Sequence, residues 1–134
     1  MDLLVNIDVD DLEKAARFYC DALGLKVGRR FDGWLELVGG AAPIYLLPKA
    51  GGTEAFSGGA KRDYARHWTP VHLDFVVPDI RKALERALAA GATLERDVTV
   101  HAYGKLALLA DPFGNGFCLL EFTGRGYDAI TLRP

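Results

Sequence analysis

Apolar and polar residues alternate in two short segments of the chain, and each segment is followed by apolar residues at helical spacing. Residues 5–16 read VNIDVDDLEKAA, and residues 73–84 read LDFVVPDIRKAL. Alternation is typical of a half-buried strand, whereas apolar residues three and four positions apart are typical of a helix with one buried face. Each segment therefore predicts a strand followed by a helix.

The two predicted helices have recognisable ends. Asp10 is expected to cap the first helix, with Glu13 three residues later completing a capping box, and Asp79 is expected to cap the second. Gly24 and Gly91 stand where a glycine commonly ends a helix. Each helix is thus expected to have a defined start and stop.

Three further apolar segments after each helix predict three strands. They are expected near residues 25–31, 34–39 and 43–48 in the first half, and near residues 93–100, 105–110 and 116–122 in the second. Asp32 and Gly33 predict a two-residue hairpin turn between the first two of these strands. The order of one strand, one helix and three strands thus occurs twice. A period of about 70 residues is too long for a solenoid and indicates a duplicated βαβββ unit.

The duplication predicts one α+β domain for the 134 residues. Two βαβββ units, residues 1–50 and 69–124, are expected to form curved mixed sheets around a central cleft. Residues 51–68 are rich in glycine and charge and are expected to connect the units. Residues 125–134 form a C-terminal tail without a clear period.

The opening strands of the two units carry polar groups on one face only. Asn6 and Asp8 share a face of the first strand, and His72 and Asp74 share the corresponding face of the second unit's opening strand. Polar groups are costly to bury unpaired, so this face should be solvated or line a cavity. Because the final strand, FCLLEF, is apolar on both sides, a lined cleft is favoured over an ordinary solvated face.

Composition narrows the possible functions. Half of the residues are apolar and a quarter are charged, as in soluble globular proteins. A net charge of −2 argues against nucleic acid as a partner. No apolar segment predicts a membrane span, and the acidic start is unlike a signal peptide. Two cysteines, Cys20 and Cys118, are too few for a disulfide framework, so a cytoplasmic protein with reduced thiols is expected.

The order and spacing of these motifs resemble the vicinal oxygen chelate superfamily. That group includes glyoxalase I, extradiol dioxygenases, and fosfomycin- and bleomycin-resistance proteins. The resemblance rests on the repeated βαβββ order, the DL and DI helix starts, the GAT after the second helix and the DPFGN turn, and it covers residues 3–122. The ending GNGFCLLEF is similar to glyoxalase-like members of unassigned function.

The resemblance implies where a metal would bind. In metal-using members the ligands come from the first and last strands of each unit, which here places Leu4, Tyr45, His72 and Cys118 at those positions. Only His72 matches the family pattern. A catalytic site needs about three protein ligands and one open position, and His72 with Cys118 supplies two at most. No cofactor is therefore expected, and a divalent metal, if bound, would be held by His72 with Cys118 or Asp74.

The functional hypothesis is a glyoxalase/bleomycin-resistance-like homodimer that binds a small organic molecule in its cleft, without a catalytic metal. The predicted ligand-binding residues are Asn6, Asp8, Trp34, Tyr45, His72, Asp74, Tyr103 and Cys118. Trp34, Tyr45 and Tyr103, together with Trp68, would offer flat surfaces on which a ligand could stack. Asp8 and Asp74 would favour a cationic or hydrogen-bond-donating ligand.

Enzymatic alternatives remain open. A metal-dependent lyase, isomerase or dioxygenase would use a divalent ion to hold two vicinal oxygens of its substrate. A metal-free enzyme would use His72 as its catalytic general base. A Cys118 thiolate beside His72 would be nucleophilic, although a cysteine within an apolar strand is more typically a packing group.

The exposure or direction of three further side chains can also be predicted. His67 and Trp68, at the end of the connector, are expected to be exposed and half-buried respectively. Glu121 should point away from Cys118, because three positions along a strand change the face unless a bulge intervenes.

Overall fold

The protein, seen in a computed structural model that describes residues 1–132, consists of the predicted unit of one strand, one helix and three strands, formed twice. The elements are β1 (Val5–Val9), α1 (Leu12–Leu23), β2 (Lys26–Arg30), β3 (Leu35–Val38), β4 (Ile44–Pro48), β5 (Leu73–Val76), α2 (Ile80–Ala89), β6 (Thr93–His101), β7 (Gly104–Ala110), β8 (Gly116–Phe122) and the 3-10 helix η1 (Gly126–Ile130). The last two residues of the predicted tail lie outside the described residues.

Both sheets have the same topology. The strand order is β1-β4-β3-β2 in the first sheet and β5-β8-β7-β6 in the second. In each sheet the opening strand pairs in parallel with the last strand of its unit, which places Asn6 opposite Tyr45 and Asp74 opposite Cys118. The predicted α+β fold of two repeated units is confirmed. Because the topology leaves β1 and β5 at sheet edges, each has one side of its backbone free of a ladder partner.

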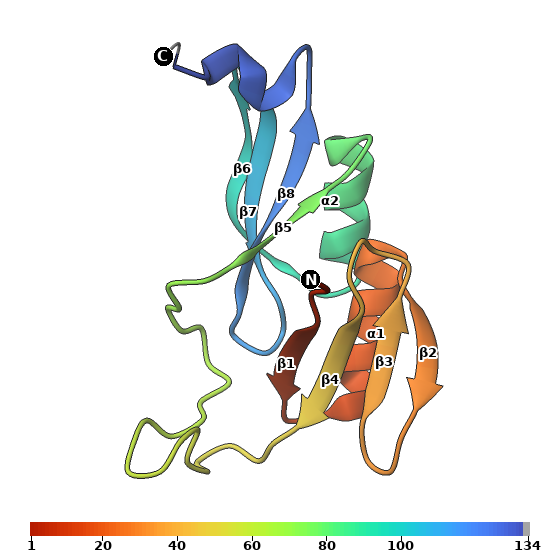
Figure 1. Ribbon diagram of the computed structural model, residues 1–134, viewed down its shortest axis with the longest axis vertical. Helices are drawn as coiled ribbons and strands as arrows, with labels where there is room; N and C mark the ends of the chain where they lie inside the picture. The colour runs from red at the N-terminus through yellow and green to blue at the C-terminus, as the bar shows by residue number, and fades with distance from the viewer. Residues whose placement is uncertain (133–134) are drawn as a thin grey trace.

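The two helices join the units around one core. Figure 1 shows one sheet at each end of the molecule and α2 above α1, and the two helices contact each other. Their apolar faces contribute fully buried residues such as Ala15 and Ile80 to a cluster that also contains Val9 of β1. Val71 precedes β5, which begins at Leu73, and is 74% exposed.

The first helix begins one residue later than predicted. Asp11, not Asp10, has the extended backbone of a cap, and its carboxylate accepts a hydrogen bond from the Lys14 amide at 3.0 Å. Glu13 therefore occupies the first turn and forms no capping box; it pairs with Arg30 at 3.2 Å. The predicted caps Asp79 and Gly24 are confirmed, the latter with a φ of 70° that favours glycine.

Side chains from other elements complete the helix ends. The Arg86 guanidinium of α2 donates to the carbonyls of Cys20 and Asp21 at the end of α1. Glu121 of β8 accepts from the first amide of α2, that of Ile80, at 2.8 Å. Both charges match the sign that a helix end favours. Glu121 thus points toward the helices and away from Cys118, as its position in the strand predicts.

A buried carboxylate ties the first helix to the DPFGN turn. Asp111 is 5% exposed and accepts hydrogen bonds from the amides of Phe113 and Asn115, from the Asn115 side chain and from the Tyr19 hydroxyl. Burial, and then the nearby Asp111 charge, raise the pKa of Tyr19 well above its usual value. Tyr19 therefore remains a neutral donor that links the two units.

The connector leaves the body of the molecule between β4 and β5 (Figure 1). Glu54 and Lys61 form an isolated antiparallel bridge within it. No helix in residues 1–132 combines the length and apolar character that crossing a membrane requires.

Candidate functional site

A candidate site is a hollow of about 670 Å³ between β1 and β5, which we call the inter-unit hollow. Four consecutive residues of the first strand line it: Val5, Asn6, Ile7 and Asp8. Since neighbouring residues of a strand face opposite sides of the sheet, the hollow must run along the free edge of β1 rather than over one face. Val71, His72 and Leu73 line its other side in the same way.

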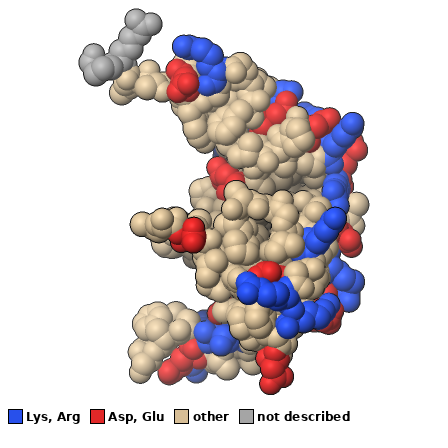
Figure 2. Space-filling view, turned by 45° about the vertical axis from the view of Figure 1, so that its right-hand side comes forward, with Lys and Arg blue, Asp and Glu red and all other residues tan. Residues whose placement is uncertain are grey.

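The connector forms a wall of the inter-unit hollow. Arg62 lines it and donates from Nε to the Asp8 carboxylate of β1 at 2.8 Å. The Arg62 side chain is only 18% exposed, so this ion pair is partly shielded from water. Further along, the Tyr64 hydroxyl donates to the Lys49 carbonyl at 2.7 Å. In Figure 2 the connector projects at the bottom of the molecule, whose outline is indented above it.

A second hollow, of about 190 Å³, adjoins the first on the side of β8. His72, Trp68 and Thr69 line both hollows. The smaller one also contacts Cys118 and an ion pair in which Arg66 binds both oxygens of Glu95, at 2.6 and 2.9 Å. The two hollows thus share one wall, and His72 stands on it.

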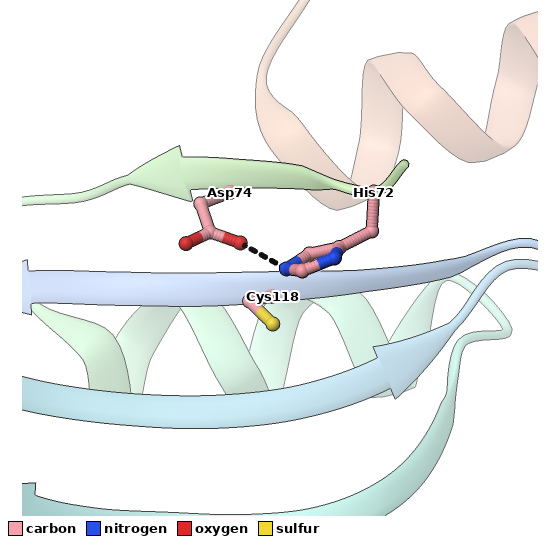
Figure 3. A group of neighbouring side chains, drawn as sticks. All are labelled: His72, Asp74 and Cys118. Atoms are coloured by element: carbon pink, nitrogen blue, oxygen red, sulfur yellow. Dashed lines mark ion pairs between the residues drawn. The ribbon is translucent and has the colours of Figure 1, made fainter. Parts of the chain in front are cut away.

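Three of the predicted site residues meet on this wall. Figure 3 shows Asp74 on β5, and His72 just before this strand, directed toward Cys118 on the adjacent β8. His72 Nε2 lies 3.1 Å from an oxygen of Asp74, and potential ligand atoms of all three residues lie within 4.8 Å of one another. Parallel pairing of β5 with β8 produces this group, because it sets Asp74 directly opposite Cys118.

The thiol of Cys118 is held protonated. Burial, the Asp74 charge and a hydrogen bond to Asp74 raise the pKa of Cys118 to about 12. The thiolate, not the thiol, is the nucleophile and the metal ligand. Near neutral pH Cys118 is therefore a hydrogen-bonding wall residue, and the nucleophilic alternative loses its support.

Two of the family's four metal-binding positions offer no free ligand atom. Leu4 is 57% exposed and has no donor atom. The hydroxyl of Tyr45 is engaged by the Glu36 carboxylate and by Arg29, each at 3.0 Å. His72 alone remains an ordinary ligand at these positions, and a single imidazole does not make a catalytic centre.

A cluster that the sequence reasoning missed surrounds Tyr45 on the first sheet. Glu36 is 6% exposed and is bound by Arg29 Nε at 2.9 Å. Hydrogen bonds from Arg29 are the main cause of the lowered pKa of Glu36, and they outweigh the effect of its desolvation. Trp34 stacks on Phe31 beside this group, with ring centres 3.9 Å apart. The alternation in LELV could have identified Glu36, since it faces away from the buried Leu35 and Leu37.

Tyr103, another predicted site residue, lies away from both hollows. Its ring stacks on His101, with centres 5.0 Å apart, and tilts against Tyr127 of η1. Neither hollow has Tyr103 in its lining. The structure therefore brings Asn6, Asp8 and His72 to the inter-unit hollow and leaves Trp34, Tyr45 and Tyr103 in other clusters.

The expected exposures of His67 and Trp68 are reversed. His67 is half-buried and lines the inter-unit hollow, whereas Trp68 is 83% exposed at the boundary of both hollows. The reason is local: the His67 amide donates to the Gly114 carbonyl of the DPFGN turn, which turns this side chain inward. The site residues that sequence reasoning missed, Arg62, Arg66 and Glu95, are charged residues whose partners are distant in sequence.

Comparison with known proteins agrees with this architecture. No curated protein sequence matched the chain. A glyoxalase/bleomycin resistance protein/dioxygenase family enzyme from Burkholderia phytofirmans is 25% identical, with a TM-score of 0.72 over 92% of this chain and 100% of that one. A glyoxalase/bleomycin resistance protein from Albidiferax ferrireducens is 23% identical, with a TM-score of 0.66 over 90% and 97% of the two chains.

A third similar structure is a glyoxalase-related enzyme from Fulvimarina pelagi, 19% identical, with a TM-score of 0.70 over 90% of this chain and 87% of that one. The profile of the glyoxalase-like domain matches residues 4–120, which include both units and the wall that bears His72. The chain belongs to the glyoxalase-like domain family.

Proposed function

We propose that the protein binds a small organic molecule in the inter-unit hollow and does so without a metal ion. The single observation that carries the proposal is the hollow itself, which is about 670 Å³ in volume and is lined by both apolar and polar residues. Small-molecule sites typically have volumes of about 300–1,000 Å³ and this kind of lining. The free backbone edges of β1 and β5 add hydrogen-bonding groups along its length.

Trp68 supports an aromatic ligand. Its indole is 83% exposed at the rim of the hollow, an unusual position for so large an apolar group unless it contacts another molecule. A flat ligand stacked on an indole gains about 0.5–1.5 kcal/mol beyond the burial of its surface. Phe75 and Phe117 contribute further aromatic surface deeper in the hollow.

The departure from the family's ligand set supports binding without a metal. Leu4 has no donor in its side chain, and the Tyr45 hydroxyl is bound to Glu36. His72 then serves as a hydrogen-bonding group of the wall, oriented by Asp74 at 3.1 Å. The metal-dependent alternative would have to use His72, Asp74 and Cys118, whose potential ligand atoms lie within 4.8 Å of one another.

A binding experiment with a naphthalene probe tests the proposal. Naphthalene-2-carboxamide is expected to bind with an affinity in the micromolar to millimolar range, detected by calorimetry and by saturation transfer in the NMR spectrum. Trp68→Ala is expected to weaken binding by about three- to tenfold, because it removes one stacking surface. Trp34→Ala, whose ring stacks on Phe31 outside the hollow, is the matched control and should leave the affinity unchanged.

We also propose a homodimer in solution. Large apolar side chains are exposed around the free edges of β1 and β5: Leu3 69%, Leu4 57%, Trp68 83%, Val71 74% and Val76 59%. Exposed apolar groups near unpaired strand edges are typical of a surface that another chain covers. Sedimentation equilibrium is expected to give twice the chain mass, and Val76→Asp is expected to weaken the dimer. A wild-type protein that sediments as a monomer at all concentrations would contradict this proposal.

A further inference from the structure

We propose that the ligand of the inter-unit hollow is an electrically neutral aromatic molecule rather than an ion. This inference rests on the proposed binding function and specifies its ligand class. It follows from the charges around both hollows: positive and negative side chains are equal in number, and most of them form ion pairs with one another.

The first matched pair is Asp8 with Arg62. Both residues line the inter-unit hollow, and Arg62 Nε binds the Asp8 carboxylate at 2.8 Å. Arg62 is also held by the Glu54 carbonyl and, at 3.3 Å, by the Thr53 hydroxyl. The guanidinium thus has few free donors for an anion, and the Asp8 charge is neutralised before a cation arrives.

The second matched pair is Glu95 with Arg66, in the smaller hollow. Two hydrogen bonds, at 2.6 and 2.9 Å, join the guanidinium to both carboxylate oxygens. Hydrogen bonds from Arg66 lower the pKa of Glu95, so the acid is ionised and the pair is neutral as a unit. Arg66 also donates to the Gly114 carbonyl at 3.4 Å.

The remaining charges of the inter-unit hollow balance as well. Lys61 and Asp63 both line it, both are exposed to water, and their charges are opposite. Asp63 also accepts a hydrogen bond from the Ala65 amide at 2.9 Å. Asp74 lies behind His72 rather than in the lining, and its carboxylate is occupied by His72 and the Cys118 thiol.

Balanced pairs disfavour a charged ligand for a physical reason. An ion that enters a hollow loses water, and this cost is recovered only if an unpaired opposite charge receives it. At Asp8 and Arg62, and at Glu95 and Arg66, an ion would have to compete with an existing ion pair, whereas Lys61 and Asp63 are exposed to water. A neutral aromatic ring loses little on leaving water and gains contact with the apolar residues of the lining. Of the two kinds of ligand expected from Asp8 and Asp74, cationic or hydrogen-bond-donating, this inference keeps the hydrogen-bond-donating kind and replaces the cationic one.

Three probes of one shape test this inference by calorimetry: naphthalene-2-carboxamide, which is neutral, 2-naphthoate, and 2-naphthylmethylammonium. The wild-type protein is expected to bind the amide at least about tenfold more tightly than either ion. Arg62→Gln leaves Asp8 unpaired and should strengthen binding of the ammonium probe about fivefold or more. Asp8→Asn leaves Arg62 unpaired and should strengthen binding of naphthoate in the same way.

The double variant Asp8→Asn with Arg62→Gln is the matched control, because it restores neutrality and should restore the preference for the amide. Circular dichroism and thermal melting establish that each variant is folded. If the wild-type protein binds an ion as tightly as the amide, the inference of a neutral ligand is wrong and the binding function stands. If none of the three probes binds, the proposed function and this inference are both wrong.

Discussion

Replacement of Asp111 with alanine is expected to lower the free energy of unfolding by about 3–5 kcal/mol. The carboxylate is 5% exposed and accepts four hydrogen bonds, three of them within the DPFGN turn and one from Tyr19. Its removal leaves buried donors without partners, which costs more than the hydrogen bonds themselves contributed. Urea denaturation followed by circular dichroism measures the change.

Two matched variants locate the effect of Asp111. Tyr19→Phe removes only the hydroxyl that donates to Asp111 and is expected to cost about 1–3 kcal/mol. Asp97→Ala removes an exposed carboxylate paired with Arg81 and is expected to change stability by less than about 0.5 kcal/mol. An Asp111→Ala protein no less stable than the Asp97→Ala protein would contradict the assigned role of this carboxylate.

Cys118 is expected to react with iodoacetamide at least about a thousandfold more slowly near neutral pH than a thiol with the ordinary pKa of 9.0. A pKa of about 12 lowers the thiolate fraction by three powers of ten, and only the thiolate is alkylated. The rate should rise about tenfold for each pH unit until the protein unfolds. Mass spectrometry of a Cys20→Ser protein, in which Cys118 is the only thiol, measures the rate.

Asp74→Asn supplies the control for Cys118. It removes the carboxylate charge that contributes to the raised pKa and keeps a side chain of similar shape, so alkylation should become faster. Burial is the larger cause and remains, so the rate should stay below that of an exposed cysteine. Rapid alkylation of wild-type Cys118 would restore the nucleophilic alternative.

The fold was largely predictable because alternation and helical spacing act locally. The two segments that open the units predicted both strand-helix pairs. Tyr45 and Cys118 occupy equivalent positions in the two units, and the strand register confirms this, since Tyr45 lies opposite Asn6 and Cys118 opposite Asp74. The helix start was misjudged by one residue because Asp10 and Asp11 are both good caps. Only the backbone conformation decides between two such neighbours.

The site was less predictable because its contacts join residues far apart in sequence. Arg62 reaches Asp8 across 54 positions, and Arg66 reaches Glu95 across 29. No periodic pattern encodes such partners, since the connector that supplies both arginines has no regular structure. The proximity of His72, Asp74 and Cys118 was predictable. His72 and Asp74 are two positions apart and face the same side, and the pairing of β5 with β8 sets Asp74 opposite Cys118.

The departure from the family's metal-binding pattern is the basis for the proposed metal-independent function. Positions that would bind an ion hold an exposed Leu4, a Tyr45 bonded to Glu36 and a protonated Cys118. The space between β1 and β5 nevertheless remains open. A retained cleft with an altered ligand set is the reason for proposing binding in place of metal-assisted chemistry.

Calorimetric titration of the protein with naphthalene-2-carboxamide, once in excess EDTA and once with added Mn²⁺ or Zn²⁺, tests metal-independent binding most directly. The account predicts equal affinity under all conditions and a similar affinity for the His72→Ala protein, reduced by no more than the loss of one hydrogen bond, about three- to tenfold. Binding that occurs only with the divalent ion, and that disappears in the His72→Ala protein, would contradict it.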